Sequence, residues 1–221
     1  MAAIPKPSAT IVLLRDALAG LEVLLLQRSR REGKPGPWVF PGGKVEAADV
    51  VGGDPSSLES ARRAGVRETR EESALEVDAG ALAPISRWIT PEISPRRFDT
   101  WFFAAVLPRH QQVRVDGSEM VGHRWLAPGA ALAAQQAGEL RLAPPTFVTV
   151  SWLQAFSGSD EAVQALGVGD LLTFRPQICR LPEGAVMLYP GDAGYEPHDP
   201  EREGPRHRLW ALPSGYRYER G

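Results

Sequence analysis

The sequence predicts an α/β fold, with a mixed (α+β) sheet covered by helices on both faces. Segments rich in β-branched and aromatic residues alternate with helix-like segments along the chain. The alternation lacks the regular strand–helix–strand rhythm of a doubly wound parallel sheet. Hydrophobic residues make up 43% of the 221 residues, which is enough apolar material for a substantial core.

The chain is expected to begin with a β-hairpin. Residues 8–15 (SATIVLLR) and 22–27 (EVLLLQ) have the composition of strands, and residues 17–20 can form the turn between them. A short strand is expected at WVF, residues 38–40, because Pro and Gly bracket it on both sides. Residues 44–55 have mixed character and contain a Gly-Gly pair, so we expect a loop there.

A long helix is expected next, with Ser56 or Ser57 as its N-cap and its end at about Ala74. One face of this helix carries small or apolar residues, namely Leu58, Ala61, Ala64 and Gly65. Such a face can lie close to a sheet.

The remaining elements follow from the same patterns. Strands are expected at 86–90, 98–107, 123–126, 185–189 and 207–212, and helices at 130–137, 146–156 and 160–166. Residues 1–156 are interpreted as one domain and residues 157–221 as a C-terminal extension packed on it. This extension could cap a site, extend the sheet or form a dimer contact.

Bulk properties narrow the classes of partner. The net charge of −2 gives no overall attraction to nucleic acid or to an anionic membrane. The single cysteine excludes an internal disulfide framework. No apolar run approaches the roughly 20 residues that span a bilayer, and the N-terminus does not have the pattern of a signal peptide, so we expect a cytoplasmic protein.

Three carboxylates stand out on the long helix. Glu68, Glu71 and Glu72 have i, i+3 and i+4 spacing and therefore share one helix face. Concentrated oxygen ligands suit Mg²⁺, particularly when a phosphate supplies further ligands. The neighbouring Arg67 can orient a carboxylate or contact phosphate. A solvated face with Arg67–Glu71 and Glu59–Arg63 ion pairs would explain the same charges without a function.

The complete spacing favours the functional interpretation. The stretch resembles the Nudix box, G-x5-E-x7-R-E-U-x-E-E-x-G-U, in which U is a bulky aliphatic residue. The residues in register are Gly53, Glu59, Arg67, Glu68, Glu71, Glu72 and Leu75. Thr69 and Ala74 depart from the pattern at positions that are not metal ligands.

Two glycines compete to open the box. PWVFPGGKVE resembles the usual entry to the box, but about ten further residues separate Gly43 from the remainder of the motif. We favour Gly43 over Gly53 as the residue beside the metal, because the expected strand leads directly into it. Residues 44–52 are then interpreted as a surface insertion that the fold does not need.

The resemblance implies a Nudix-type sandwich, a mixed sheet between helices, and a magnesium-dependent diphosphohydrolase in which manganese is an acceptable substitute. Metal ligands would be Glu68, Glu71, Glu72 and Gly43. Catalysis would involve Glu68, Glu72, Arg67 and Glu119, with the general base open among Glu68, Glu72 and Glu119. Glu59 would support the metal ligands without touching the metal. The substrate would be a small nucleoside-diphosphate derivative, and the resemblance allows a homodimer.

Further segments resemble the peroxisomal-type coenzyme A diphosphatase branch of the family, namely SPRRFDTWFFAA, RLAPPTF and the insertion within the box. The implied substrate is coenzyme A or an acyl-coenzyme A. Arg96 and Arg97, or the Arg28–Arg31 cluster, would bind its 3′-phosphate. Alternatives are a pyrophosphatase acting on ADP-ribose, a nucleoside-diphosphate sugar or a dinucleotide, and a non-catalytic nucleotide-binding module of the same fold.

Overall fold

The computed structural model describes residues 3–30 and 36–221. Its strands are β1 (Lys6–Ala17), β2 (Gly20–Arg28), β3 (Trp38–Val39), β4 (Gly42–Lys44), β5 (Ala83–Ile89), β6 (Phe98–Val106), β7 (Met120–Leu126), β8 (Leu172–Phe174), β9 (Gln177–Leu181), β10 (Gly184–Leu188), β11 (His207–Leu212) and β12 (Gly215–Arg220). Its helices are α1 (Leu58–Ser73), α2 (Pro128–Gln136), α3 (Pro144–Leu153) and α4 (Ser159–Gly167), with 3₁₀ turns η1 (Ala47–Asp49) and η2 (Ala79–Ala81).

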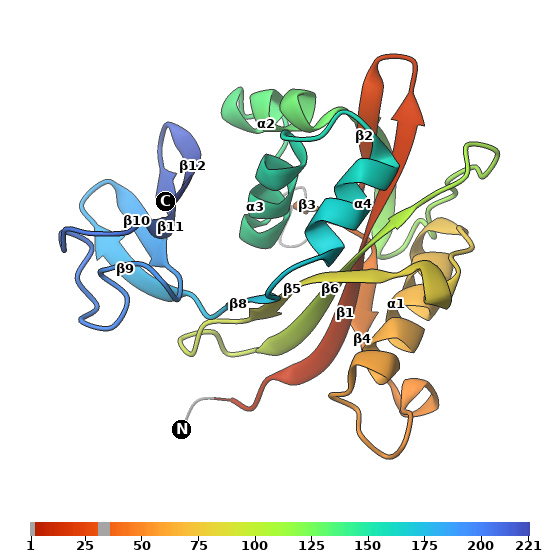
Figure 1. The fold of residues 1–221 in the computed structure, drawn as a ribbon, viewed down its shortest axis with the longest axis horizontal. Coiled ribbons are helices and arrows are strands. Elements are labelled where there is room, and N and C mark those ends of the chain that lie inside the picture. Colours follow the sequence, from red (N-terminus) through yellow and green to blue (C-terminus); the bar gives the residue numbers. More distant parts are fainter. Residues whose placement is uncertain (1–2, 31–35) are drawn as a thin grey trace.

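A large mixed sheet forms the centre of the molecule. Its strand order is β3-β2-β1-β6-β5-β8, with β4 pairing to β1 and β7 pairing to β2. The β1–β6 and β5–β8 pairs are parallel and the other pairs are antiparallel. Helix α1 covers one face, whereas α2, α3 and α4 lie on the other (Figure 1). The predicted α/β fold with a mixed sheet between helices is therefore confirmed.

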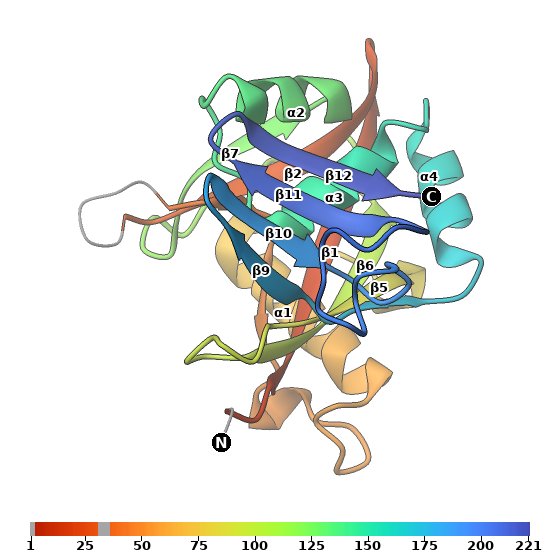
Figure 2. The ribbon, with the colours of Figure 1, turned by 90° about the vertical axis from the view of Figure 1, so that its left-hand side faces the viewer.

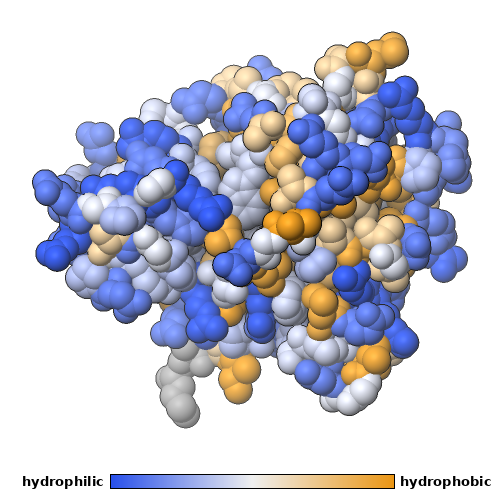
Figure 3. Space-filling view, in the orientation of Figure 1, coloured by the Kyte–Doolittle hydropathy of each residue, from blue (hydrophilic) through white to orange (hydrophobic). Residues whose placement is uncertain are grey.

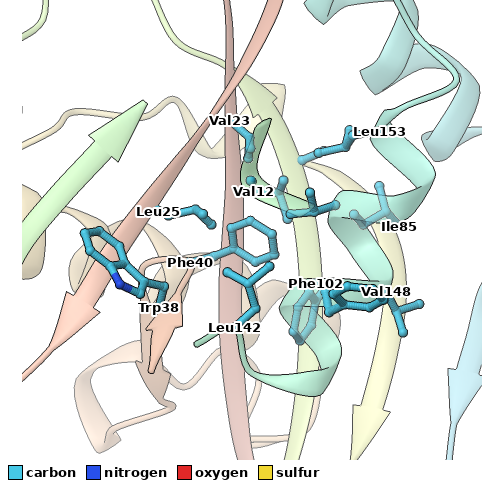
Figure 4. Close-up of a cluster of buried hydrophobic side chains, with 14 of the residues drawn as sticks. Val12, Val23, Leu25, Trp38, Phe40, Ile85, Phe102, Leu142, Val148 and Leu153 are labelled. Atoms are coloured by element: carbon cyan, nitrogen blue, oxygen red, sulfur yellow. The ribbon is translucent and has the colours of Figure 1, made fainter. Parts of the chain in front are cut away.

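Strand β1 is buried on both faces because it runs through the middle of this sandwich. Ile11 and Leu13 belong to the core under α1, whereas Val12 and Leu14 belong to the core under the other helices. Figure 4 shows the second core, where strand residues such as Val12 meet Leu153 of α3. Successive side chains of β1 point to opposite faces of the sheet, so a strand that is apolar at every position contributes to both cores.

Helix α1 lies close to the sheet through its small-residue face, as predicted. A Cβ added to Gly65 would lie 3.1 Å from Cγ1 of Ile11, which is a tight contact, so the helix lies close to the sheet at this position. Of the two expected N-caps, Ser56 and Ser57, the structure uses Ser57, whose side chain accepts a hydrogen bond from the backbone N–H of Ser60. The helix ends at Ala74, which adopts the left-handed conformation (φ 57°) that explains why glycine is usual there.

The C-terminal residues form a second sheet that the sequence predicted only in part. Strands β10 and β11 were expected, but β9 and β12 complete a four-stranded antiparallel sheet of order β12-β11-β10-β9. Figure 2 shows this small sheet lying over α3. Tyr216 and Phe147 of α3 pack edge to face, with ring centroids 5.3 Å apart. The preceding strand β8 was also unforeseen, and it extends the large sheet.

The outer surface of the small sheet is mostly hydrophilic (Figure 3). Among the described residues, no helix is long and apolar enough to cross a membrane.

A buried ion pair holds the long connection between β10 and β11. The side chains of Arg208 and Asp192 are 1% and 0% exposed, and their closest nitrogen–oxygen distance is 2.6 Å. Asp192 also accepts hydrogen bonds from the backbone N–H groups of Gly194 and His207, and Arg208 donates to the carbonyl of Pro200. All charged atoms of the pair therefore have partners, as a buried pair requires.

Replacing Asp192 with alanine should lower the free energy of unfolding by about 3–5 kcal/mol, because the Arg208 charge would be buried without a counter-ion. Chemical denaturation measures this change. The matched control is Glu219→Ala, because the side chains of the Arg217–Glu219 pair are 63% and 32% exposed. That substitution should lower the free energy of unfolding by less than about 1 kcal/mol. Similar small effects for both variants would contradict a structural role for the buried pair.

Candidate active site

Helix α1 places its three carboxylates in different environments. Glu72 is buried, with 4% of its surface exposed. The side chain of Glu68 is 17% exposed, and that of Glu71 is 57% exposed. The shared face that the spacing predicted therefore runs from the protein interior to solvent.

Glu72 is held by the backbone at the start of β4. Its Oε2 accepts a hydrogen bond of 2.8 Å from the N–H of Gly42. Burial, together with the charges of Glu68 and Glu119, raises the pKa of Glu72 to about 8 against the opposing effects of the Gly42 hydrogen bond and Arg28. An ionised Glu72 is therefore unfavourable here unless a further cation approaches.

Gly43 lies directly against Glu68. A Cβ added to Gly43 would lie 2.2 Å from Oε1 of Glu68, so only glycine leaves room for this carboxylate. Gly53, in contrast, lies in a turn with a φ of 79° and nothing within 4 Å of an added Cβ. Of the two glycines that compete in the sequence, Gly43 is the one beside the carboxylates.

Arg67 connects the parts of this site. Its Nη1 donates to Glu71 (2.9 Å), and its Nη2 donates to Glu68 (3.2 Å) and to the carbonyl of Lys44 (3.0 Å). Its Nε and Nη2 also donate to the carboxylate of Asp49, at 3.1 and 2.9 Å. The planar guanidinium can satisfy these acceptors together because its donors form a fixed fork.

Asp49 is the main residue that the sequence interpretation missed. It lies in η1 and is 4% exposed. Burial alone would raise its pKa, but hydrogen bonds from Arg67 and the backbone of Glu46, together with the Arg67 charge, hold the pKa below its ordinary value. Gly43 and Asp49 reproduce the Gly-x5-acid spacing that opens the box. The sequence contains this spacing twice, because Gly53 and Glu59 show it as well. The second copy joins the rest of the motif without an interruption, so it was assigned to the box instead of Gly43 and Asp49.

Residues 44–52 were expected to be a surface insertion, but part of this segment packs against the rest of the domain. These residues contain the end of β4, the buried Asp49, and Val45, which packs against the core under α1. The backbone N–H of Val51 also bonds to Ser60 of α1. The solvated part of the extra segment is the turn around Gly52 and Gly53.

Glu119 approaches the cluster from the start of β7. Its charge acts on both Glu68 and Glu72. The preceding Asp116 accepts hydrogen bonds from the backbone N–H groups of Glu119 (2.7 Å) and Met120 (3.0 Å). The carbonyl of Glu119 accepts a bond of 2.7 Å from the N–H of Ser29. The turn at Asp116 thus orients the backbone that carries Glu119.

Other predicted residues lie apart from this cluster. Glu59 is exposed in the first turn of α1, and the nine residues to Glu68 correspond to about 13 Å of helix, so it cannot support the metal ligands as expected. Arg96 is exposed between β5 and β6, and Arg97 donates to the carbonyls of Thr90 and Ala3 at 3.0 and 2.9 Å. Within the Arg28–Arg31 cluster, the charge of Arg28 acts on Glu72, whereas Arg31 lies outside the described residues.

The donor chemistry of the cluster suits a divalent cation. The charge of Glu119 acts on both Glu68 and Glu72, and Gly43 leaves room for the Glu68 carboxylate beside the backbone, so negatively charged oxygen ligands are concentrated here. Among the described residues, however, no three acidic, His or Cys side chains converge on a single point. Arg67 binds one oxygen of Glu68 and Gly42 binds one oxygen of Glu72, so each contact leaves the second oxygen of its carboxylate for a cation.

Comparison with known proteins places this geometry in a family. The chain matches the NUDIX domain over residues 5–146. It belongs to the Nudix family. The predicted family is thereby confirmed, and Gly43, Arg67, Glu68, Glu71 and Glu72 lie within the matched region.

Two groups of relatives are informative about this Nudix chain. It is 33% identical over 196 residues to acyl-coenzyme A diphosphatase NUDT19 from Homo sapiens, covering 84% of this chain and 50% of that protein. The Xenopus laevis protein of the same name is 32% identical over 131 residues, covering 56% of this chain and 34% of that protein. The chain thus spans at most about half the length of these curated relatives.

Solved structures support the fold. A NUDIX hydrolase from Alicyclobacillus acidocaldarius has a TM-score of 0.67 and 24% identity, covering 76% of this chain and 99% of that chain. A MutT NUDIX hydrolase from Burkholderia pseudomallei has a TM-score of 0.50 and 19% identity, covering 67% of this chain and 98% of that chain.

The buried Glu72 makes the stability of the metal-free protein depend on pH. Its folded pKa of about 8 exceeds the ordinary value of 4.5, so the folded state loses stability as pH rises from about 4.5 to 8. Glu72→Gln keeps the shape but cannot ionise. It should match the wild type near pH 4.5 and exceed its free energy of unfolding by a few kcal/mol at pH 8, since each pKa unit corresponds to about 1.4 kcal/mol. Denaturation in EDTA at several pH values measures the difference, and a pH-independent difference would contradict the assignment.

The contact between Asp49 and Arg67 should matter for stability, whereas the tip of the same segment should not. Asp49→Ala should lower the free energy of unfolding by about 1–3 kcal/mol, because buried donors of Arg67 lose their acceptor. Two residues inserted between Gly52 and Gly53 are the control, since nothing lies within 4 Å of either position. This insertion should change stability by less than about 0.6 kcal/mol. Equal effects of the two changes, measured by urea denaturation, would contradict the interpretation.

Proposed function

We propose that this Nudix chain hydrolyses the diphosphate linkage of coenzyme A or an acyl-coenzyme A. The products would be adenosine 3′,5′-bisphosphate and the corresponding 4′-phosphopantetheine compound. The main support is the similarity to an acyl-coenzyme A diphosphatase over 84% of the chain, because this match extends beyond the NUDIX domain at residues 5–146 into the C-terminal sheet. Similarity outside the common domain favours a shared substrate over a shared fold alone, since Nudix specificity lies outside the box.

The residues that would hold Mg²⁺, or Mn²⁺ in its place, are Glu68, Glu71, Glu72, Glu119 and the carbonyl of Gly43. When bound, the metal ions would polarise the phosphoryl oxygens and neutralise their charge. Arg67 would keep Glu68 and Glu71 oriented, because it already binds both. Its contact with the buried Asp49 fixes the guanidinium and so limits how far the cluster can move.

The reaction itself needs a water molecule and a proton acceptor. The water oxygen forms a bond to one phosphorus, and the bridging phosphorus–oxygen bond breaks so that the other phosphate leaves as a monoester. One of Glu68, Glu72 and Glu119 takes the proton from the water. One oxygen of Glu72 is fixed by the backbone N–H of Gly42, whereas at Glu119 the backbone is fixed by Asp116 and the side chain is exposed.

Product analysis with coenzyme A, ADP-ribose and a nucleoside-diphosphate sugar tests the proposal. With Mg²⁺ present, kcat/KM should be highest for coenzyme A, and the products should be the bisphosphate and phosphopantetheine. Glu72→Gln should lower kcat about a thousandfold, a loss of about 4 kcal/mol of transition-state stabilisation. The matched control is Glu76→Gln, because Glu76 is exposed just after α1 and contacts only Arg70 by its side chain among the described residues. Faster turnover of ADP-ribose than of coenzyme A would refute the substrate assignment.

A further inference from the structure

A groove lies between the first sheet and the C-terminal sheet, away from the carboxylate cluster. Its volume is about 870 Å³, which falls within the usual range for small-molecule sites. One wall is the end of the β5–β6 hairpin with Ile89 and Arg97, and the other is formed by β9 and the connection that follows β10. The second wall contributes Gln177, Tyr195 and His198.

The second wall is rigidly built, although it belongs to a long connection. The buried Asp192–Arg208 pair fixes the segment in which Tyr195 and His198 lie. His198 adopts a left-handed backbone conformation with a φ of 55°, and its Nδ1 lies 2.8 Å from Oε1 of Gln177. Long ordered connections and uncommon backbone conformations of this kind are concentrated at functional sites.

Two arginines of the groove, Arg97 and Arg175, form no ion pair with a carboxylate among the described residues. Among the described residues, Arg175 forms neither a hydrogen bond nor an ion pair, and it is exposed beside Tyr195. Arg97 donates only to backbone carbonyls, so its charge also lacks a counter-ion within the described chain. Asp99, in contrast, is already neutralised by two hydrogen bonds from Arg87, of 2.7 and 2.6 Å.

The groove also offers groups that suit a nucleobase. Ile89, Ile93 and Ile178 supply an apolar surface against which a ring can pack. Glu92 and Glu196 supply carboxylate oxygens that can accept hydrogen bonds from an exocyclic amine. A ligand with a flat base, an amine and a phosphate is therefore complementary to the groove.

The groove lies within reach of the carboxylate cluster. Pro5 forms part of its edge, and four residues further along β1 Ala9 pairs with Gly43, which contacts Glu68. At about 3.3 Å per residue, this separation is roughly 13 Å along the strand. A nucleoside diphosphate extending from the cluster to the far end of its base covers a comparable distance.

We propose that this groove binds the 3′-phosphoadenosine half of the substrate, with Arg175 and Arg97 contacting the 3′-phosphate. This inference rests on the proposed function. Within it, Arg175 and Arg97 are the residues that make the enzyme prefer coenzyme A. From the sequence, Arg96 and Arg97 were expected to bind the 3′-phosphate. In this proposal Arg97 binds it together with Arg175, which lies far from Arg97 in the sequence, and Arg96 does not take part. The carboxylate cluster recognises the diphosphate, and the groove distinguishes coenzyme A from compounds that lack the 3′-phosphate.

Arg175→Ala tests this assignment with little risk to folding, because the side chain has no partner among the described residues. It should raise KM for coenzyme A about tenfold, corresponding to about 1.4 kcal/mol. KM for dephospho-coenzyme A and kcat for both substrates should stay unchanged. Arg180→Ala is the matched control, since Arg180 is an exposed arginine on β9 outside the groove. An unchanged KM for coenzyme A in Arg175→Ala, or equal increases for both substrates, would overturn the proposal.

Calorimetric titration of the metal-free protein provides a measurement independent of turnover. Adenosine 3′,5′-bisphosphate should bind about tenfold more tightly than AMP to the wild type, and Arg175→Ala should abolish this difference. Equal affinities of the two nucleotides for the wild type would overturn the groove assignment. A wild type that cleaves none of the diphosphates but retains the Arg175-dependent preference would instead refute the proposed function and leave the nucleotide site standing.

Discussion

The contact between Arg67 and Asp49 is the interaction on which the candidate active site depends. A carboxylate that is 4% exposed needs a nearby positive charge, and Arg67 supplies it through three hydrogen bonds while its remaining donors reach Glu68, Glu71 and the backbone of Lys44. One guanidinium therefore joins β4, η1 and α1. Because its fork is planar and rigid, the relative positions of these elements are determined together.

The same region combines groups that destabilise one another. Burial raises the pKa of both Glu68 and Glu72, the charge of Glu119 acts in the same direction on both, and the charge of Glu68 also raises the pKa of Glu72. Glycine at positions 42 and 43 lets the backbone approach these carboxylates closely. The N–H of Gly42 bonds to Glu72, and Gly43 lies against Glu68. Electrostatic conflict that a bound cation would relieve is a common feature of functional sites, where the local requirement for chemistry differs from that for stability.

The C-terminal sheet is stabilised by aromatic packing and by one buried ion pair with matched charges. Its inner face joins the core through aromatic contacts such as Tyr216 with Phe147, and its long connection is fixed by the buried pair of Arg208 and Asp192. This arrangement converts a segment rich in Pro, Gly and charge into a fixed surface. The groove beside the hairpin of the first sheet therefore has one wall whose backbone is fixed by a buried ion pair.

The sequence by itself determined the features that depend on local periodicity and short-range chemistry. These features are the β1–β2 hairpin, the approximate limits of α1, the small face around Gly65 and the shared face of Glu68 and Glu72. Only the tertiary structure decided which acid pairs with Arg67. Asp49 and Glu59 are both suitable by type, and an insertion of unknown path separates them, so their distances from Arg67 depend on how the intervening chain folds back. The sequence also did not determine how short C-terminal strands such as GYRYER pair. These strands have few apolar residues, and those residues form a buried face only because the neighbouring strands and α3 pack against them.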